Sequence, residues 1–72
     1  MISREQLEIW AKLYDLGHQS LEENVATRQA RAELNMQLEQ EYARLIQGGS
    51  IPFRDFRREA IRHIRAFLIK ER

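Results

Sequence analysis

The chain has 72 residues, of which 43% are hydrophobic and 32% are charged, and it contains no cysteine. This length allows a single small domain, residues 1–72, and the composition is typical of a folded helical protein, which excludes a disordered chain. Because cysteine is absent, neither a disulfide nor a thiolate metal site can stabilise so small a core, and association with another chain is the usual remedy.

The charge and hydropathy patterns narrow the class further. No apolar run is long enough to span a bilayer, and the N-terminal sequence MISREQ lacks the basic and apolar regions of a signal peptide, so we expect a cytoplasmic protein. The net charge is +1. Residues 1–49 carry five basic and eight acidic side chains, a balance of −3, whereas residues 50–72 carry seven and three, a balance of +4. The basic surface therefore belongs to the C-terminal segment.

A first helix is expected from about residue 4 to residue 16. Ser3 and Gln6 form a capping box at its start, and Gly17 is expected to end it. The tight connection around His18, which is interpreted as a capping or solvent-facing residue, makes this helix an antiparallel neighbour of the next. Apolar side chains cover over half of the helix circumference: Leu7, Ile9, Trp10, Ala11, Leu13, Tyr14 and Leu16. One neighbouring helix cannot cover so wide a surface.

The chain is organised around one long helix, expected from residue 21 to residue 47. Ser20 and Glu23 form a capping box at its start, and Gly48 is expected to close it in the left-handed conformation. One apolar face, predicted to be buried, comprises Leu21, Val25, Ala32, Met36, Ala43 and Ile46. A second face, in the C-terminal half, comprises Leu34, Leu38, Tyr42 and Leu45. Two apolar faces require two sets of neighbours.

A third, strongly amphipathic helix is expected over residues 53–70, with Pro52 near its start. Its apolar face comprises Phe53, Phe56, Ala60, Ile61, Ile64, Phe67 and Leu68. Four basic residues line one edge of this face, and we call them the arginine ridge: Arg54, Arg58, Arg62 and Arg65. Arg57 lies inside the apolar arc, so we expect it to reach a carboxylate on the central helix or to extend its guanidinium group to solvent.

The arginine ridge is compatible with more than one role. Four guanidinium groups on one helical edge could bind the phosphates of a nucleic acid or the carboxylates of an acidic partner. The plainer alternative is that they balance the acidic excess of the first two helices, within the chain or across a dimer. Weak overall charge and the lack of a helix-turn-helix pattern count against nucleic acid. A membrane-surface role is disfavoured because the apolar face is more simply used as core.

No residue pattern indicates catalysis or a cofactor. Ser3, Ser20 and Ser50 are each explained as helix-entry residues, and neither histidine is paired with an acid in a recognisable pattern, so nucleophilic catalysis has no support. Glu59 and His63 are four residues apart on one helical face, but two ligands without a third do not make a metal site. We therefore expect no catalytic residue, no metal and no cofactor.

The expected fold is all-α, a helical hairpin with the third helix returning along the C-terminal half of the central one. Homodimerisation, or a heteromeric protein partner, is expected to complete the bundle. The predicted interface residues are Trp10, Leu13, Leu34, Leu38, Tyr42 and Leu45. The expected function is that of a non-enzymatic adaptor, inhibitor or regulator acting through helix–helix association. The alternatives are a nucleic-acid-binding regulator that uses the arginine ridge, and an all-helical enzyme with a site between subunits.

Overall fold

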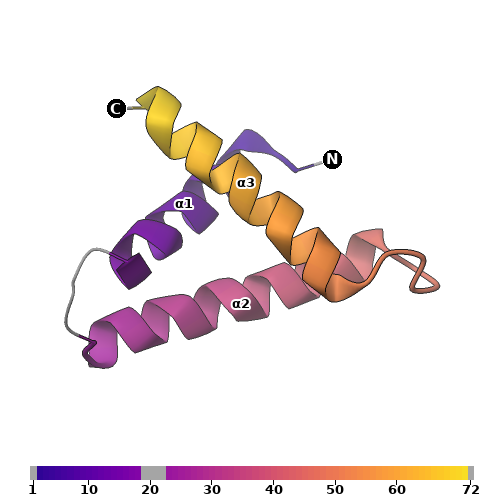
Figure 1. Ribbon diagram of the computed structural model, residues 1–72, viewed down its shortest axis with the longest axis horizontal. Helices are drawn as coiled ribbons and strands as arrows, with labels where there is room; N and C mark the ends of the chain where they lie inside the picture. The colour runs from indigo at the N-terminus through magenta and orange to yellow at the C-terminus, as the bar shows by residue number, and fades with distance from the viewer. Residues whose placement is uncertain (1, 19–22, 72) are drawn as a thin grey trace.

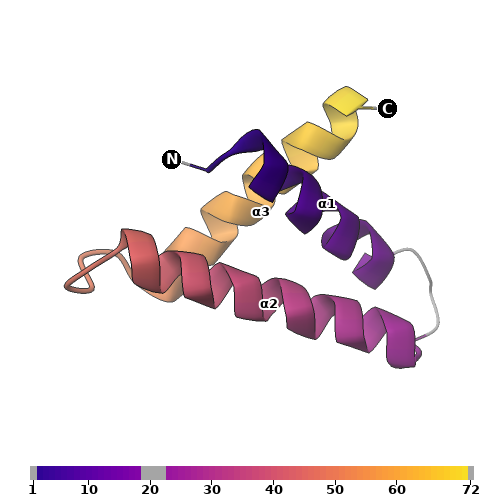
Figure 2. The same cartoon turned by 180° about the vertical axis from the view of Figure 1, so that it is seen from behind.

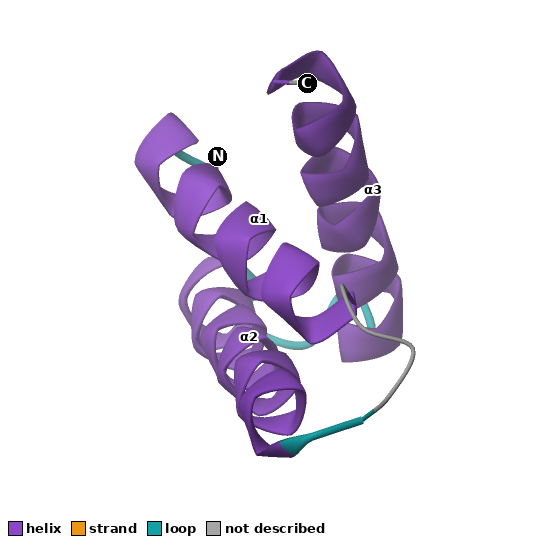
Figure 3. Ribbon diagram, turned by 90° about the vertical axis from the view of Figure 1, so that its left-hand side faces the viewer, coloured by secondary structure: helices purple, strands orange, loops and turns teal. Residues whose placement is uncertain are grey.

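The computed structural model describes residues 2–18 and 23–71, and the described residues fold into three helices without a strand (Figure 1). The helices are α1 (Arg4–His18), α2 (Val25–Leu45) and α3 (Phe53–Glu71). The predicted all-α fold is confirmed. Figure 2 shows the same arrangement from behind, and Figure 3 shows it from the side, with α1 next to both α2 and α3. No helix in the described ranges combines the length and the apolar sequence that a bilayer crossing requires.

The first two helices form the antiparallel hairpin that the short connection predicts. Near the start of α1, the Gln6 amide donates a hydrogen bond to Oε1 of Gln37 at 3.1 Å. At the other end of α1, Gly17 packs against the side chain of Arg31, which lies early in α2. Residues that are distant in sequence therefore pair in reverse order along the two helices.

Gly17 does not end α1, contrary to the sequence prediction, because the helix continues to His18. Gly17 is buried, and a Cβ atom built on it would lie only 2.7 Å from Cγ of Arg31. The glycine thus allows the two helices to approach closely instead of terminating one of them. The predicted cap at the other end of α1 is confirmed in part, since the backbone N–H of Gln6 donates to Oγ of Ser3 at 3.1 Å.

The central helix α2 begins at Val25, later than predicted. Asn24 is its N-cap: the side-chain Oδ1 accepts from the backbone N–H of Thr27 at 2.9 Å, and the Thr27 hydroxyl accepts from the backbone N–H of Asn24 at 3.0 Å. This reciprocal capping box takes the place of the predicted one. Ser20, on which that prediction depended, lies outside the described residues, and Glu23 lies before the helix.

The chain reverses direction between α2 and α3 at two glycines. α2 ends at Leu45, and Gly48 and Gly49 follow with φ angles of 85° and 66°. The left-handed conformation expected of Gly48 is confirmed, although the helix stops two residues earlier than predicted. On the far side of the turn, the Tyr42 ring packs at 5.4 Å centroid distance against Phe53, so the start of α3 contacts the C-terminal end of α2. The rest of α3 does not run along α2 as expected, because it diverges from α2 and lies beside α1 (Figure 1).

The core is one cluster to which all three helices contribute. Its buried members are Trp10, Ala11, Leu34, Leu38, Ala60 and Ile64. Trp10, Leu38 and Ile64, one from each helix, are completely buried. The second predicted face of α2 supplies its part of this core. Of the first face, predicted to be buried, Leu21 lies outside the described residues, and the rest is largely exposed, with Val25 and Met36 at 60% and 45% exposure. That prediction is wrong because α1 and α3 both pack on the other side of α2.

Candidate functional site

An open apolar groove of about 600 Å³ lies between α1 and α2. Leu13 and Leu16 line it from α1, and Ala26, Ala32 and Met36 line it from α2. These positions follow from helical periodicity, because residues three, four or seven apart lie on one face of a helix.

Apolar exposure extends beyond the groove along the same helices. Ile9 lies four residues before Leu13, and Val25 lies eleven residues before Met36, so each continues an apolar stripe at helical spacing. Both are large side chains that stay exposed. Large apolar side chains that stay exposed along one surface of a folded domain commonly mark a site of interaction. The two stripes and the groove therefore form the strongest candidate interaction surface of the chain.

The apolar groove has a polar end. Glu33 lines the groove and also lines a neighbouring polar hollow of about 390 Å³. The Gln37 amide donates to Oε1 of Glu33 at 3.1 Å, and Gln37 in turn accepts a hydrogen bond from Gln6. Glu41 and Arg44, which form an ion pair, also line this hollow. A partner lying along the groove would thus meet an apolar segment and then amides and charged groups.

The residues predicted for an oligomer interface do not lie on one surface. Trp10, Leu34 and Leu38 are buried by the chain's own helices, where they form the core. Leu13 lines the apolar groove, and the two remaining residues, at the C-terminal end of α2, are half-buried. Oligomerisation itself stays a prediction. The exposed side chains of the groove were missed as interface candidates because the sequence pattern placed their face of α2 in the core.

The arginine ridge is partly neutralised by acids of its own helix. Nε of Arg54 lies 3.7 Å from Oδ1 of Asp55, and Nη1 of Arg62 lies 3.3 Å from Oε2 of Glu59. Two of the four arginines of the ridge are thus paired with acids of α3.

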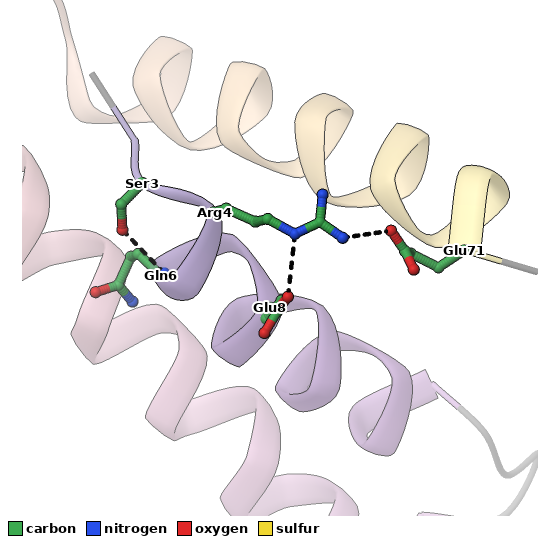
Figure 4. Close-up of polar contacts among 5 residues, drawn as sticks. All are labelled: Ser3, Arg4, Gln6, Glu8 and Glu71. Carbon is green, nitrogen blue, oxygen red and sulfur yellow. Dashed lines mark hydrogen bonds and ion pairs between the residues drawn. The ribbon is translucent and has the colours of Figure 1, made fainter.

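An ion pair between helices is formed by an arginine of α1 instead. Nη2 of Arg4 lies 3.0 Å from Oε1 of Glu71, and Nε of the same guanidinium lies 3.3 Å from Oε1 of Glu8 (Figure 4). The guanidinium carbon also lies 5.7 Å from the ring centroid of Phe67. Because these charged side chains are largely exposed, such pairs contribute at most about 1 kcal/mol each. Their main effect is to hold the start of α1 beside the end of α3.

A second hollow, of about 210 Å³, lies where all three helices meet, and we call it the basic cleft. It is lined by Tyr14, His18, Arg31, Leu34, Arg57, Ile61 and Arg65. Only Arg65 was singled out as a binding residue from the sequence. The unusual position of Arg57 inside the apolar arc was the one available signal for this cleft. Arg57 does reach α2, but its Nε–H donates to the amide oxygen of Asn35 at 3.2 Å rather than to a carboxylate.

The two histidines contact neighbouring residues of their own helices. His18 is the last residue of α1, its Nδ1 lies 2.8 Å from the backbone oxygen of Tyr14, and its ring stacks on the Tyr14 ring at 4.3 Å. His63 lies 3.8 Å from Glu59, the pair noted in the sequence. Within the described ranges, no group of three His, Cys, Asp or Glu side chains could hold a metal ion.

No protein-family model, curated protein or solved structure matches this chain. Function is therefore inferred from the surfaces of the molecule itself.

Proposed function

We propose that the protein is a non-enzymatic helical interaction protein, acting as an adaptor, inhibitor or regulator, whose apolar groove receives a helix from another chain. One observation supports this above all. Four large apolar side chains on α1 and α2 remain between 45% and 60% exposed, and two of them, Leu16 and Met36, line the groove. They are Ile9, Leu16, Val25 and Met36.

The shape of the groove suits a helix. Two neighbouring helices present ridges and a groove into which the side chains of a third helix pack. Ala26, Ala30 and Ala32 carry only methyl groups, so a partner backbone can approach closely, and Met36 adjusts its flexible side chain to the partner. Glu33 at the polar end favours a partner whose apolar face is followed by a Lys, an Arg or an amide.

The exposed apolar side chains limit how much binding free energy this surface can supply. Full burial of a large apolar side chain contributes about 1.5 to 3 kcal/mol, so covering four that are already half covered yields about 3 to 6 kcal/mol. Association itself costs at least about 4 kcal/mol in lost translational and rotational freedom. The partner must therefore add contacts of its own, which favours a helix long enough to reach both the apolar groove and its polar end.

Site-specific photo-crosslinking in cells tests the proposal. A photoreactive phenylalanine analogue replaces Met36, which lines the groove, and in a matched control it replaces Ile69, which is 74% exposed on α3. We expect a discrete adduct from position 36 and none from position 69. An adduct of twice the chain mass would identify a second copy of this chain, and an adduct with another polypeptide would identify a heteromeric partner. Absence of an adduct at position 36, or equal adducts at both positions, would refute the proposal.

The groove interaction is then checked by substitution. Leu16→Glu places a carboxylate in the groove wall, at a side chain that is exposed in the single chain, so the fold should persist. We expect this variant to lose the adduct at position 36 while its circular dichroism spectrum stays unchanged. An undiminished adduct in the Leu16→Glu variant would show that the crosslinked partner does not occupy the groove.

Nucleic-acid binding by the arginine ridge has less support. Arg54 and Arg62 are paired with acids that alternate with them on α3, so the ridge offers a weaker positive field than its sequence predicts. Phosphate contacts would show as a salt-dependent affinity for DNA or RNA.

A further inference from the structure

The basic cleft collects three guanidinium groups in a small hollow that no carboxylate of the described residues lines. Arg31 comes from α2, and Arg57 and Arg65 come from α3. Like charges held close together repel one another, although water screens part of the repulsion because all three arginines are exposed. The net charge of the chain is only +1, so the positive charge is concentrated at this cleft. Binding of an anion there would reduce the repulsion among the three arginines.

Two of these arginines are held through Nε, which leaves their terminal nitrogens available. Nε–H of Arg65 donates to the Tyr14 hydroxyl at 2.9 Å, and its guanidinium carbon lies 5.9 Å from the Tyr14 ring centroid. Nε–H of Arg57 donates to Oδ1 of Asn35 at 3.2 Å. No described contact uses the two Nη groups of either side chain. Each guanidinium is thus positioned by a neutral partner while the donors at its end remain free for a ligand.

The third arginine, Arg31, packs its side chain against Gly17. The stem of Arg31 passes directly over Gly17 of α1, where a Cβ atom would collide with it. Its Nη2 group forms an ion pair with Glu23, whose side chain is largely exposed before the start of α2. Among the described residues, Glu23 is the one acid that pairs with an arginine of the cleft. Three positive groups therefore face one partly solvated negative group.

We propose that the basic cleft binds a small phosphomonoester. Its phosphate group would lie among the three guanidinium groups, and its organic part would lie against Leu34, Ile61 and the stacked rings of Tyr14 and His18. A carboxylate is satisfied by one guanidinium fork, whereas a phosphate monoester carries nearly two charges and three acceptor oxygens, which matches three separate donors.

The dimensions of the cleft favour a small molecule over a nucleic acid. Its volume of about 210 Å³ is below the range of about 300 to 1,000 Å³ typical of drug-sized ligand sites. A nucleic-acid backbone would need a track of phosphate-binding groups leading away from the cleft. Arg54 and Arg62, which could extend such a track along α3, are paired with acids of their own helix. The cleft and the apolar groove share no lining residue, so this proposal is independent of the groove.

Calorimetric titration of the unaltered chain at low salt provides the first test. Phenyl phosphate is the probe, and inorganic phosphate, benzoate and a single-stranded oligonucleotide are the comparisons. We expect saturable binding of phenyl phosphate with one site per chain, weaker binding of inorganic phosphate and no measurable binding of benzoate. Equal binding of benzoate and phenyl phosphate would overturn the phosphate assignment. Saturable binding of the oligonucleotide alone would overturn the small-molecule assignment.

Matched variants locate the site. Arg57→Gln removes a charge that lines the cleft, and Arg58→Gln removes the same charge from the next residue of α3, which is equally exposed but does not line the cleft. A hydrogen bond to a charged group contributes about 1.5 to 3 kcal/mol, so Arg57→Gln should weaken phenyl phosphate binding at least about tenfold. Arg58→Gln should change it less than about twofold, because Arg58 does not line the cleft and its charge acts on the ligand only through screened solvent. Equal losses in the two variants would refute a site in the cleft.

A measurement on the unaltered chain guards against a variant that fails to fold. In proton–nitrogen correlation spectra, addition of phenyl phosphate should shift the side-chain Nε–H signals of Arg57 and Arg65, and the signal of Arg58 should stay in place. Shifts confined to Arg58, or spread equally over all exposed arginines, would show that phosphate associates with the general positive charge of α3 and would overturn the proposal.

Discussion

Replacing Gly17 by alanine tests the close approach of α1 and α2 most directly. Gly17 lies within α1, and its φ angle is not in the left-handed region, so alanine fits the backbone. Inside a helix, alanine is more stable than glycine by about 0.5 to 1 kcal/mol, and Gly17, as the second-last residue of α1, belongs at the lower end of this range. If no other atom interfered, the variant would therefore be more stable than the natural chain.

The side chain of Arg31 reverses that expectation. The new Cβ atom would lie 2.7 Å from Cγ of Arg31, whereas carbon atoms in contact are about 3.5 to 4.0 Å apart. Cγ is close to the backbone, so the stem cannot move away without leaving its rotamer or separating the helices. Overpacking of this kind costs about 1 to 3 kcal/mol. After subtraction of the gain from helix propensity, Gly17→Ala should lower the free energy of unfolding by about 1 kcal/mol.

A double-mutant cycle isolates this contact. In the Arg31→Ala background the obstructing Cγ is absent, and the nearest remaining atom is the backbone nitrogen of residue 31 at 3.6 Å, an ordinary contact. Gly17→Ala should then raise the free energy of unfolding by about 0.5 to 1 kcal/mol, which gives a coupling energy of about 1.5 to 2 kcal/mol between positions 17 and 31. Urea denaturation followed by the fluorescence of Trp10, the single tryptophan, measures all four variants. A coupling energy below about 0.3 kcal/mol would refute the close approach.

Two further substitutions test the assignment of buried and capping residues. Leu38→Ala should lower the free energy of unfolding by about 2 to 5 kcal/mol, because this side chain is completely buried, whereas Met36→Ala on the exposed face of α2 should change it by less than about 1 kcal/mol. Equal losses would show that both faces of α2 are buried. Asn24→Ala should cost about 1 kcal/mol through loss of the N-cap, and urea denaturation that shows no change would place the start of α2 elsewhere.

The sequence predicts the number, order and type of the helices well because each helix has strong local signals. It does not predict which face of α2 is buried. Both of its faces have apolar residues at helical spacing, and the choice between them depends on where α1 and α3 pack, which is a property of the whole fold. Leu38 and Met36 are equally good core candidates from periodicity alone, but the structure buries one and exposes the other.

The basic cleft was missed for a related reason. Its members come from three helices, and Tyr14 and Arg65, which are hydrogen-bonded, are 51 residues apart. No local spacing in the sequence could join them. The start of α2 is ambiguous in the sequence for a different reason. Ser20 with Glu23 and Asn24 with Thr27 both have the spacing of a capping box, and glutamate is a more usual third residue of this motif than threonine.

The ion pair between Arg4 and Glu71 places the first turn of α1 beside the last turn of α3 (Figure 4). At the opposite end of α3, the turn at Gly48 and Gly49 is exposed, and no atom lies within 4 Å of a Cβ position at either glycine. Exposed turns of this kind are the positions at which a folded chain best tolerates insertions. A short polar insertion between Gly48 and Gly49 should therefore leave the core shared by the three helices intact.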